Sequence, residues 1–454
     1  MSYLRKICRA MAAGKDARTD AVLDACARSA NAPHLYAFSD FAIPGFLDKC
    51  KAVHVHPLSD LAEIVRFACE VEPDLVIVGP EEPLELGLVD AMDDLGIPCF
   101  GPPRSLARIE SSKAWARQLV DRYGIGGNPA HRVFESADGM HSFLGELGGF
   151  VVKPDGLTGG KGVKVSGEHL QSINEAIDFA LDVIQSHGRV VIEEKLEGQE
   201  FSLQTITDGI AVVHCPVVQD HKRAGEGDTG PNTGGMGSYS CPDGSLPFLT
   251  GSELQAAQLI NERVIEALQR EASGIPYRGV LYGGFMLTRS GLRLVEYNAR
   301  FGDPEALNVL PLLETDFLDL CQGVANGRLH DVDVRFAKKA TVCKYVVPKG
   351  YPSGKGKGDR ISVPADVLET PGLRCFWAAC ERLDGDTVMT GSRAVAFTGI
   401  ADTIEEAERL AEMGARSVEG EVFHRRDIGT PAAIAARVRH MEAVRSSSTS
   451  YIGS

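Results

Sequence analysis

Two predicted strands enclose the segment Lys153-Pro154-Asp155-Gly156-Leu157-Thr158-Gly159-Gly160-Lys161-Gly162-Val163, which holds four glycines and two lysines. Glycine lets the backbone come close to an anion, and exposed N–H groups together with Lys161 can cover a polyphosphate. The segment lacks the GxxxxGK[ST] pattern of a Walker loop. An ordinary flexible hairpin is the alternative, but the two lysines favour a loop that covers phosphate.

The elements around this segment predict an α+β region from about residue 111 to residue 329. Short apolar runs are separated by Gly-rich turns, and a long helix precedes two further strands. The predicted strands are 150–153, 162–165, 190–193, 201–205, 279–288 and 291–297, and the predicted helices are 105–123 and 254–271.

Residues 191–200 run from an apolar strand into paired acids and then a glycine. Such a stretch can form a linker whose backbone reads the edge of an adenine ring, while Glu200 accepts hydrogen bonds from ribose hydroxyls. Acids after a strand usually form a solvated turn, so this segment alone decides little.

Residues 294–305 combine a strand with side chains that suit a metal ion. On a strand, Glu296 and Asn298 point to the same face, because side chains repeat every two residues. Two oxygen-bearing side chains suit Mg²⁺, which shares its remaining coordination with phosphate and water. Arg300 follows and can meet a carboxylate or phosphate through two hydrogen bonds. A surface strand with polar residues is the alternative.

The first hundred residues alternate apolar strands with helical patterns. That order predicts an open parallel sheet, which binds ligands at the carboxyl ends of its strands. The breaks at Gly79-Pro80 and Gly101-Pro102 fall at such strand ends. The predicted strands are 34–38, 52–56, 75–79 and 99–101, and the predicted helices are 17–28, 58–70 and 86–95. Beyond residue 340 the pattern is mixed again, with a strand at 341–347 and a helix at 403–418.

Composition and charge exclude several classes of protein. A chain of 454 residues is too long for one ordinary core, so we expect two to four packed units. A net charge of -15 opposes binding to nucleic acid and to anionic membranes. Apolar runs are too short for a membrane span, and the interrupted, basic start is unlike a secretory signal. Eleven cysteines without a CxxC pair favour reduced thiols and a cytoplasmic protein.

Taken together, residues 153–163, 191–200 and 294–305 have the order and spacing of the ATP-grasp fold, in which two α+β lobes clamp ATP. Residues 219–223, QDHKR, and 228–237, DTGPNTGGMG, resemble the signature of glycinamide ribonucleotide synthetase. The same family is matched by residues 79–84, 110–113, 298–305 and 425–429, and its archaeal branch by residues 343–348, 350–352 and 392–396.

This resemblance implies a multidomain protein of α/β and α+β class. We expect an N-terminal open parallel α/β substrate domain at residues 1–110 and a central ATP-grasp domain at 111–332, with a lid subdomain at about 124–196. A small mixed C-terminal domain would follow at 333–454.

The resemblance also implies a reaction. ATP, glycine and 5-phosphoribosylamine would give glycinamide ribonucleotide, ADP and phosphate through glycyl phosphate, in de novo purine biosynthesis. Such a ligase would use Mg²⁺ or Mn²⁺, with ATP as a co-substrate. Its partners would be small molecules, not nucleic acid or membranes, and it would be a monomer or a small homo-oligomer.

Roles for individual residues follow from the same resemblance. ATP would be bound by Lys113, Lys153, Gly159, Gly160, Lys161, Gly162, Glu193, Lys195, Leu196 and Glu200. The metal ion would be held by Glu296 and Asn298, and the catalytic residues would be Asp220, Lys222, Arg223 and Arg300. The other substrates would be bound by Gly79, Pro80, Glu81, Asn232, Thr233, Gly234, Gly235, Met236, Asp303 and Arg18.

The N-terminal loop departs from the family pattern. The family has a G-x-G-G-R-E-H-type loop, whereas this chain has Gly14-Lys15-Asp16-Ala17-Arg18-Thr19-Asp20. That loop would hold the phosphate of the ribosylamine at a helix N-terminus, where Asp16 is electrostatically unfavourable. Two alternatives stay open: a ligase of this lineage with a different amine acceptor, and a nucleotide-binding homologue without catalysis. The intact lysines and metal ligands argue against the second.

Overall fold

The N-terminal sheet of the computed structural model, which describes residues 6–157 and 162–446, is parallel along its whole strand order. That order is β3-β2-β1-β4-β5, which confirms the predicted open α/β sheet. The strands are β1 (Arg9–Ala13), β2 (His34–Ser39), β3 (Ala52–Val55), β4 (Leu75–Val78) and β5 (Cys99–Phe100). The helices are α1 (Ala17–Ala27), α2 (Pro44–Lys49), α3 (Leu61–Val71), α4 (Glu81–Leu86), α5 (Leu88–Asp94), α6 (Arg104–Ser111) and α7 (Lys113–Arg122).

The central strand of this sheet, β1, is absent from the predicted elements. Its sequence is Arg-Ala-Met-Ala-Ala, and alanine carries a weak strand signal. Residues 10–13 are nonetheless fully buried, because helices cover both faces of a parallel sheet. Burial in the tertiary structure therefore decides the conformation of β1.

The predicted helix at 105–123 is divided into α6 and α7, and the predicted helix at 86–95 begins later, at Leu88, after the short helix α4, which was not predicted. Gly87 has a φ of 91°, which only glycine adopts readily, and it separates α4 from α5. Ser112 is extended, and its hydroxyl caps α7 by accepting the backbone N–H of Trp115 at 3.0 Å. This break turns Lys113, at the start of α7, away from the direction of α6.

The middle region forms two antiparallel sheets. Their orders are β11-β10-β16-β17 and β6-β9-β7-β8. The strands are β6 (His131–Phe134), β7 (Phe150–Pro154), β8 (Lys164–Val165), β9 (Val190–Glu194), β10 (Gly198–Thr207), β11 (Val212–His214), β16 (Gly279–Thr288) and β17 (Gly291–Asn298). The helices are α8 (Met140–Leu147), α9 (Ile173–His187) and α10 (Gly251–Glu271).

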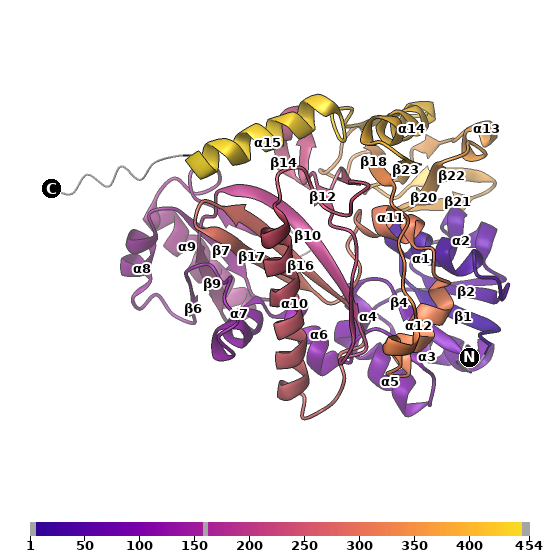
Figure 1. Cartoon of the computed structure of the whole chain (residues 1–454), viewed down its shortest axis with the longest axis horizontal. Coiled ribbons are helices and arrows are strands. Elements are labelled where there is room, and N and C mark those ends of the chain that lie inside the picture. The colour runs from indigo at the N-terminus through magenta and orange to yellow at the C-terminus, as the bar shows by residue number, and fades with distance from the viewer. Residues whose placement is uncertain (1–5, 158–161, 447–454) are drawn as a thin grey trace.

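The β6-β9-β7-β8 sheet belongs to a lobe with its own core. Its strands β6, β7 and β9 pack with α8 and α9 on one side of the molecule (Figure 1). Buried residues such as Phe134, Leu144 and Val183 form a cluster separate from the large core of the remaining chain. A lobe that shares little apolar packing with its neighbours is suited to closing over a cleft.

The C-terminal region builds a sheet that also takes in strands from the middle of the chain. Its order is β12-β15-β18-β23-β20, with β24 paired to β18. The strands are β12 (Gln219–Asp220), β15 (Gly237–Ser240), β18 (Ala340–Pro348), β20 (Leu373–Trp377), β23 (Val395–Ala401) and β24 (Val422–His424), and the smaller ones nearby are β13 (Arg223–Gly225), β14 (Thr229–Asn232), β19 (Arg360–Ile361), β21 (Cys380–Leu383) and β22 (Asp386–Met389). The loop between β12 and β15 is therefore anchored at both ends to this sheet.

The last described helix, α15 (Pro431–Ser446), runs back from the C-terminal region across the β11-β10-β16-β17 sheet, which we call the central sheet (Figure 1). It contacts β10 and β16, and its Arg437 forms an ion pair with Asp228 at 2.5 Å. Arg445 pairs with Glu253 of α10 at 2.8 Å. Across the described residues, no helix combines the length and apolar character needed to cross a bilayer. The other helices of this half are α11 (Ala306–Val309), α12 (Phe317–Ala325), α13 (Ala365–Leu368) and α14 (Ile404–Ser417).

A buried carboxylate joins the N-terminal and C-terminal regions. Asp20 on α1 is fully buried, and Lys49 on α2 donates to its Oδ1 atom at 2.7 Å. The backbone N–H of Trp377 on β20 donates to the Oδ2 atom at 2.8 Å. Because a buried charge is stable only when it is paired and hydrogen-bonded, both regions depend on this contact.

Removing the cation from this contact should destabilise the chain. In Lys49→Met the Asp20 carboxylate would lose its ionic partner, which we expect to cost about 3–5 kcal/mol. Lys51→Met is the matched control, because Lys51 is exposed, and it should change the free energy of unfolding by at most about 0.5 kcal/mol. Urea denaturation followed by tryptophan fluorescence measures both variants. Equal effects of the two variants would contradict the assigned role of this contact.

Candidate active site

A cleft of about 1020 Å³ lies between the N-terminal sheet, the lobe and the central sheet. Its walls include the carboxyl ends of the parallel strands, which is where the sequence predicts ligand binding. The structure brings together on this cleft the predicted residues Arg18, Pro80, Glu81, Lys113, Lys153, Glu193, Lys195, Leu196, Glu200, Asp220, Lys222, Arg223, Asn232, Thr233, Gly234, Glu296, Asn298, Arg300 and Asp303.

Four predicted residues lie beside the cleft rather than on its wall: Gly79, Gly162, Gly235 and Met236. A Cβ at Gly79 would lie 2.2 Å from the Thr19 hydroxyl, so this glycine lets β4 pack closely against α1. A Cβ at Gly235 would lie 2.7 Å from a carboxylate oxygen of Asp220. Gly159, Gly160 and Lys161 lie outside the described residues.

Two lysines line one part of the cleft. Lys153 on β7 lies 2.6 Å from a carboxylate oxygen of Glu193, and Lys113 donates to the carbonyl of Gly156 at 2.9 Å. Burial lowers the pKa of Lys113, and the nearby Lys153 lowers it further, against the opposing effect of Glu296. Two ammonium groups held near each other form a site for a polyanion.

Glu193 is buried in an ion network. The Nε and Nη2 atoms of Arg117 lie 2.7 and 2.9 Å from its two oxygens, and Lys153 shares the second oxygen. Burial alone would raise the pKa of Glu193, but Arg117 and Lys153 outweigh it and hold the value at about 2. The Glu193 carboxylate therefore orients Lys153.

The predicted metal ligands lie on the face of the central sheet that lines the cleft. In the β16–β17 pairing, Asn298 is opposite Tyr282 and Glu296 is opposite Gly284. Burial raises the pKa of Glu296, but nearby lysines, Lys222 first, outweigh it and keep the carboxylate ionised. No side chain among residues 6–157 and 162–446 donates a hydrogen bond to that carboxylate.

This donor set fits a hard cation. An ionised carboxylate and an amide oxygen on one strand face are the ligands Mg²⁺ or Mn²⁺ takes beside phosphate oxygens and water. In the described part of the chain there is no cluster of three or more His, Cys, Asp or Glu suited to a metal. The fit therefore rests on Glu296 and Asn298 acting with a bound polyphosphate.

The predicted catalytic residues gather where the β12–β15 loop meets the end of β17. Lys222 pairs with Glu200, Arg223 pairs with Glu168, and Arg300 lies 2.9 Å from Glu110. Burial raises the pKa of Glu110 to about 7, although Arg300 opposes that rise. Burial also raises the pKa of Asp220 well above its ordinary value, and repulsion from Glu305 adds to it.

The N-terminal loop carries cations that are already paired. Lys15 donates to Asp40 at 2.7 Å and to Glu82 at 3.0 Å. The buried Arg18 pairs with Asp16 and donates to the carbonyl of Phe301 at 2.8 Å.

Asp16 is the N-cap of α1, where its carboxylate accepts the backbone N–H of Thr19 at 2.9 Å. This explains its place at a helix N-terminus, because the positive end of the helix dipole favours an acid there. The chain's own carboxylate thus occupies a position that a bound phosphate could take.

Three family models match consecutive parts of the chain. The phosphoribosylglycinamide synthetase N domain matches residues 8–110, the ATP-grasp (A) domain residues 111–306 and the C domain residues 341–431. The phosphoribosylamine–glycine ligase of Methanocaldococcus jannaschii is 44% identical over 440 residues, which cover 95% of this chain and 98% of that protein. The chain belongs to the phosphoribosylglycinamide synthetase family.

Further members of this family support the archaeal resemblance and the fold. The phosphoribosylamine–glycine ligase of Pyrococcus horikoshii is 44% identical and covers 90% of this chain and 92% of its own length. The solved phosphoribosylamine–glycine ligase of Thermotoga maritima superposes with a TM-score of 0.77 at 27% identity, covering 92% and 99%. A biotin carboxylase from Campylobacter jejuni shares the fold alone, with a TM-score of 0.72 at 13% identity over 96% and 99% of the two chains.

In this member of the phosphoribosylglycinamide synthetase family, the sequence did not single out two arginines that line the cleft, the buried Arg117 and the half-buried Arg393. Arg117 follows Lys113 by four residues on α7, so helical spacing was a usable signal. Arg393 donates to the carbonyls of Gly234 at 2.6 Å and Asp303 at 2.9 Å, and its guanidinium lies over the ring of Tyr345. It fixes the glycine-rich loop, and only the family resemblance at residues 392–396 marks it in the sequence.

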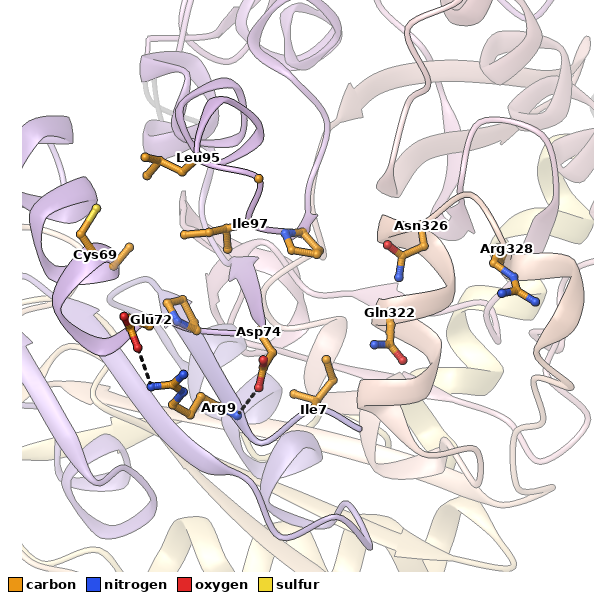
Figure 2. Close-up of a pocket in the computed structure, with 14 residues that line it drawn as sticks. Ile7, Arg9, Cys69, Glu72, Asp74, Leu95, Ile97, Gln322, Asn326 and Arg328 are labelled. Carbon is orange, nitrogen blue, oxygen red and sulfur yellow. Dashed lines mark hydrogen bonds and ion pairs between the residues drawn. The ribbon is translucent and has the colours of Figure 1, made fainter. Parts of the chain in front are cut away.

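A second cavity of about 710 Å³ lies at the opposite, amino edge of the parallel sheet (Figure 2). There Arg9 pairs with Glu72 at 3.2 Å, and its backbone N–H donates to Asp74 at 3.0 Å. Arg328 pairs with Asp331 at 2.6 Å. Because these arginines are already paired with acids, this cavity offers little unpaired positive charge to an anion.

The stability difference between the wild type and Glu193→Gln should depend on pH. Because the pKa of Glu193 is lowered by folding, its ionised form stabilises the chain above about pH 4.3, and this contribution is lost as the pH falls towards about 2. We expect a difference of about 3 kcal/mol at neutral pH, shrinking steadily below about pH 4.3.

Urea midpoints of both proteins, measured from pH 7 down to the lowest pH at which the wild type is folded, give this difference. Glu197→Gln, at an exposed position near the same strand, is the control and should show little change at any pH. A difference for Glu193→Gln that is the same at pH 7 and pH 3 would contradict the ion network.

Proposed function

We propose that this chain is an ATP-dependent carboxylate–amine ligase that joins glycine to 5-phosphoribosylamine and forms glycinamide ribonucleotide, ADP and phosphate in purine biosynthesis. One observation carries the proposal. One cleft is lined by two lysines, by the two candidate metal ligands Glu296 and Asn298, and by the glycine-rich loop between β12 and β15. Near-full-length similarity to phosphoribosylamine–glycine ligases supports the choice of substrates.

In the first step, a carboxylate oxygen of glycine attacks the γ-phosphorus of ATP, and ADP leaves. Lys113 and Lys153 would neutralise the phosphates, and Glu193 would keep Lys153 oriented. Lys195, Leu196 and Glu200 follow β9 on the cleft wall and would meet the adenosine. Mg²⁺ or Mn²⁺ held by Glu296 and Asn298 would supply charge neutralisation at the phosphate oxygens.

In the second step, the amine nitrogen attacks the carbonyl carbon of glycyl phosphate. A C–N bond forms, the C–O bond to the phosphoryl group breaks, and phosphate leaves with the bonding electrons. Lys222, Arg223 and Arg300 would stabilise the developing charge, and the loop of residues 232–236, fixed by Arg393, would hold the glycyl group. Closure of the lobe over the cleft would keep water from the acyl phosphate.

A cytoplasmic location is part of this proposal. All eleven cysteines are free thiols, as is usual for proteins kept in a reducing compartment.

A different amine acceptor is the second candidate function. It is favoured by the N-terminal loop, where Lys15 and Arg18 are each paired with a carboxylate before any substrate binds. A coupled ADP-release assay with glycine held constant and a panel of phosphorylated amines decides between the two. ADP release with 5-phosphoribosylamine supports the first, and release only with another amine supports the second.

Glu296→Gln should abolish ligation while the fold stays intact. The substitution removes a charged metal ligand without changing its volume, so we expect kcat to fall at least about a hundredfold. ADP release at saturating Mg²⁺ measures the loss, and the urea midpoint checks the fold. Near-normal turnover of Glu296→Gln would rule out the metal assignment.

Lys15 and its acidic partner Glu82 should affect the acceptor in opposite directions. If Lys15 meets the substrate phosphate, Lys15→Ala should raise the KM for 5-phosphoribosylamine about tenfold, the loss of one exposed charge-assisted contact. Glu82→Gln should lower that KM, because it removes a competitor for the same ammonium group.

Both effects should weaken at high salt and leave the KM values for ATP and glycine unchanged, since they act on one partly exposed charge. If both variants raise the KM, or neither changes it, Lys15 is not a phosphate ligand. In that case the different-acceptor function gains support.

A further inference from the structure

Glu305 is a buried carboxylate on the cleft wall to which the steps above give no role. It is 3% exposed and directly precedes α11. The hydroxyl of Tyr282 donates to its Oε1 atom at 2.8 Å. Among the described residues no other side chain donates a hydrogen bond to Glu305, and Glu305 is one of the residues that line the cleft.

Tyr282 connects Glu305 to the sheet face that carries the proposed metal ligands. Tyr282 lies opposite Asn298 in the β16–β17 pairing, on the same sheet face as the proposed metal ligands. A Cβ at Gly302 would lie 2.3 Å from the Oε2 atom of Glu305 and 2.8 Å from the ring of Tyr282. Glycine at 302 thus makes room for the carboxylate against the ring.

The second glycine-rich loop brings Asp220 to the same place. A Cβ at Gly235 would lie 2.6 Å from a ring carbon of Pro304 and 2.7 Å from an Asp220 oxygen. Asp220 therefore lies beside the residue that precedes Glu305. The cleft wall therefore carries two neighbouring carboxylates here, the buried Glu305 and the partly exposed Asp220.

Charged groups from several neighbouring elements face Glu305. They are Asp220 on β12, Lys222 just after it, Arg300 earlier on the same loop, and the Tyr282 hydroxyl on β16. Burial raises the pKa of Glu305 above its ordinary value, while the hydrogen bond from its own backbone N–H, the hydrogen bond from Tyr282 and the two cations oppose the rise. A carboxylate with a raised pKa accepts a proton more readily near neutral pH.

The ligation step needs such a group. When the amine nitrogen bonds to the carbonyl carbon, it becomes positively charged and must lose a proton before the amide is stable. A buried group within reach can take that proton without admitting water, which would hydrolyse the acyl phosphate.

We propose that Glu305 is the general base of the second step: its carboxylate takes the proton from the amine nitrogen as the C–N bond forms and phosphate leaves. Tyr282 is the positioning residue that holds this carboxylate toward the cleft. The inference rests on the proposed function, because it assumes a glycyl phosphate and an attacking amine.

Glu110 is less suited to this role, although its pKa is also raised. Its Oε2 atom accepts the backbone N–H of Ala299 at 2.7 Å, and its Oε1 atom pairs with Arg300 at 2.9 Å. Both carboxylate oxygens of Glu110 therefore already have partners, and this residue positions Arg300.

The test separates the two steps in the full-length Glu305→Gln variant. Positional isotope exchange in bridge-labelled ATP, with Mg²⁺ and glycine but no amine, reports the first step alone. Trapping with hydroxylamine reports formation of the acyl phosphate, because the adduct of this weakly basic amine loses its proton to water readily. Ligation with 5-phosphoribosylamine, made in situ from ribose 5-phosphate and ammonia, reports both steps.

In Glu305→Gln we expect the rates of isotope exchange and of hydroxamate formation to stay within threefold of the wild-type rates. The kcat for ligation should fall by about a hundredfold or more. The acidic limb of the kcat–pH profile should disappear. In Tyr282→Phe, which keeps the carboxylate but removes its hydrogen bond, the limb should move to higher pH, because that bond lowers the pKa of Glu305.

Two outcomes overturn the inference. One is ligation by Glu305→Gln within threefold of the wild type. The other is an equal loss of isotope exchange, hydroxamate formation and ligation, which would assign Glu305 to the first step or to folding. A wild type without glycine-dependent isotope exchange overturns the proposed function itself, and is thereby told apart from both.

Discussion

The buried guanidinium of Arg117 holds together the parts of the cleft that the proposed ATP site requires. Its Nε and Nη2 groups bind the carboxylate of Glu193 on β9, in the lobe. Its Nη1 and Nη2 groups also donate to the carbonyls of Leu294 and Val295 on β17, at 3.0 and 2.7 Å. A buried arginine needs a partner for every N–H group, so Arg117 joins the lobe, α7 and β17 at one point at the base of the cleft. Lys153 is positioned by its ion pair with Glu193, and Glu296 directly follows Val295, whose carbonyl accepts a hydrogen bond from Arg117.

Local patterns in the sequence predict much of this fold because they depend on neighbours along the chain. The period of two that puts Glu296 and Asn298 on one face is a property of a single strand, and the structure has β17 there. The parallel order of the first sheet likewise follows from alternating strands and helices. Strand β1 escapes prediction because its alanines are suited to the middle of a sheet only once helices cover both faces.

Arg393 and Glu305 could not be predicted from the sequence because their roles depend on residues far away along the chain. Arg393 acts on Gly234 and Asp303, which lie 159 and 90 residues away along the chain. Glu305 gains its character from burial and from the Tyr282 hydroxyl, which belongs to a strand formed by another segment. No window of the sequence contains both members of such a pair. Asp16 is the reverse case: the sequence marks it as unfavourable to phosphate, and the structure adds that it caps α1.

The course of α15 bears on how the protein is made. Through Arg437 and Arg445, this last helix reaches back to Asp228 at the edge of the glycine-rich loop and to Glu253 on α10. During synthesis the N-terminal sheet and the lobe emerge first and can form their cores in turn. The loop that would hold the glycyl group receives its last supports only when residues 431–446 have left the ribosome. A nascent chain can therefore be largely folded while this loop still lacks its contact with Arg437.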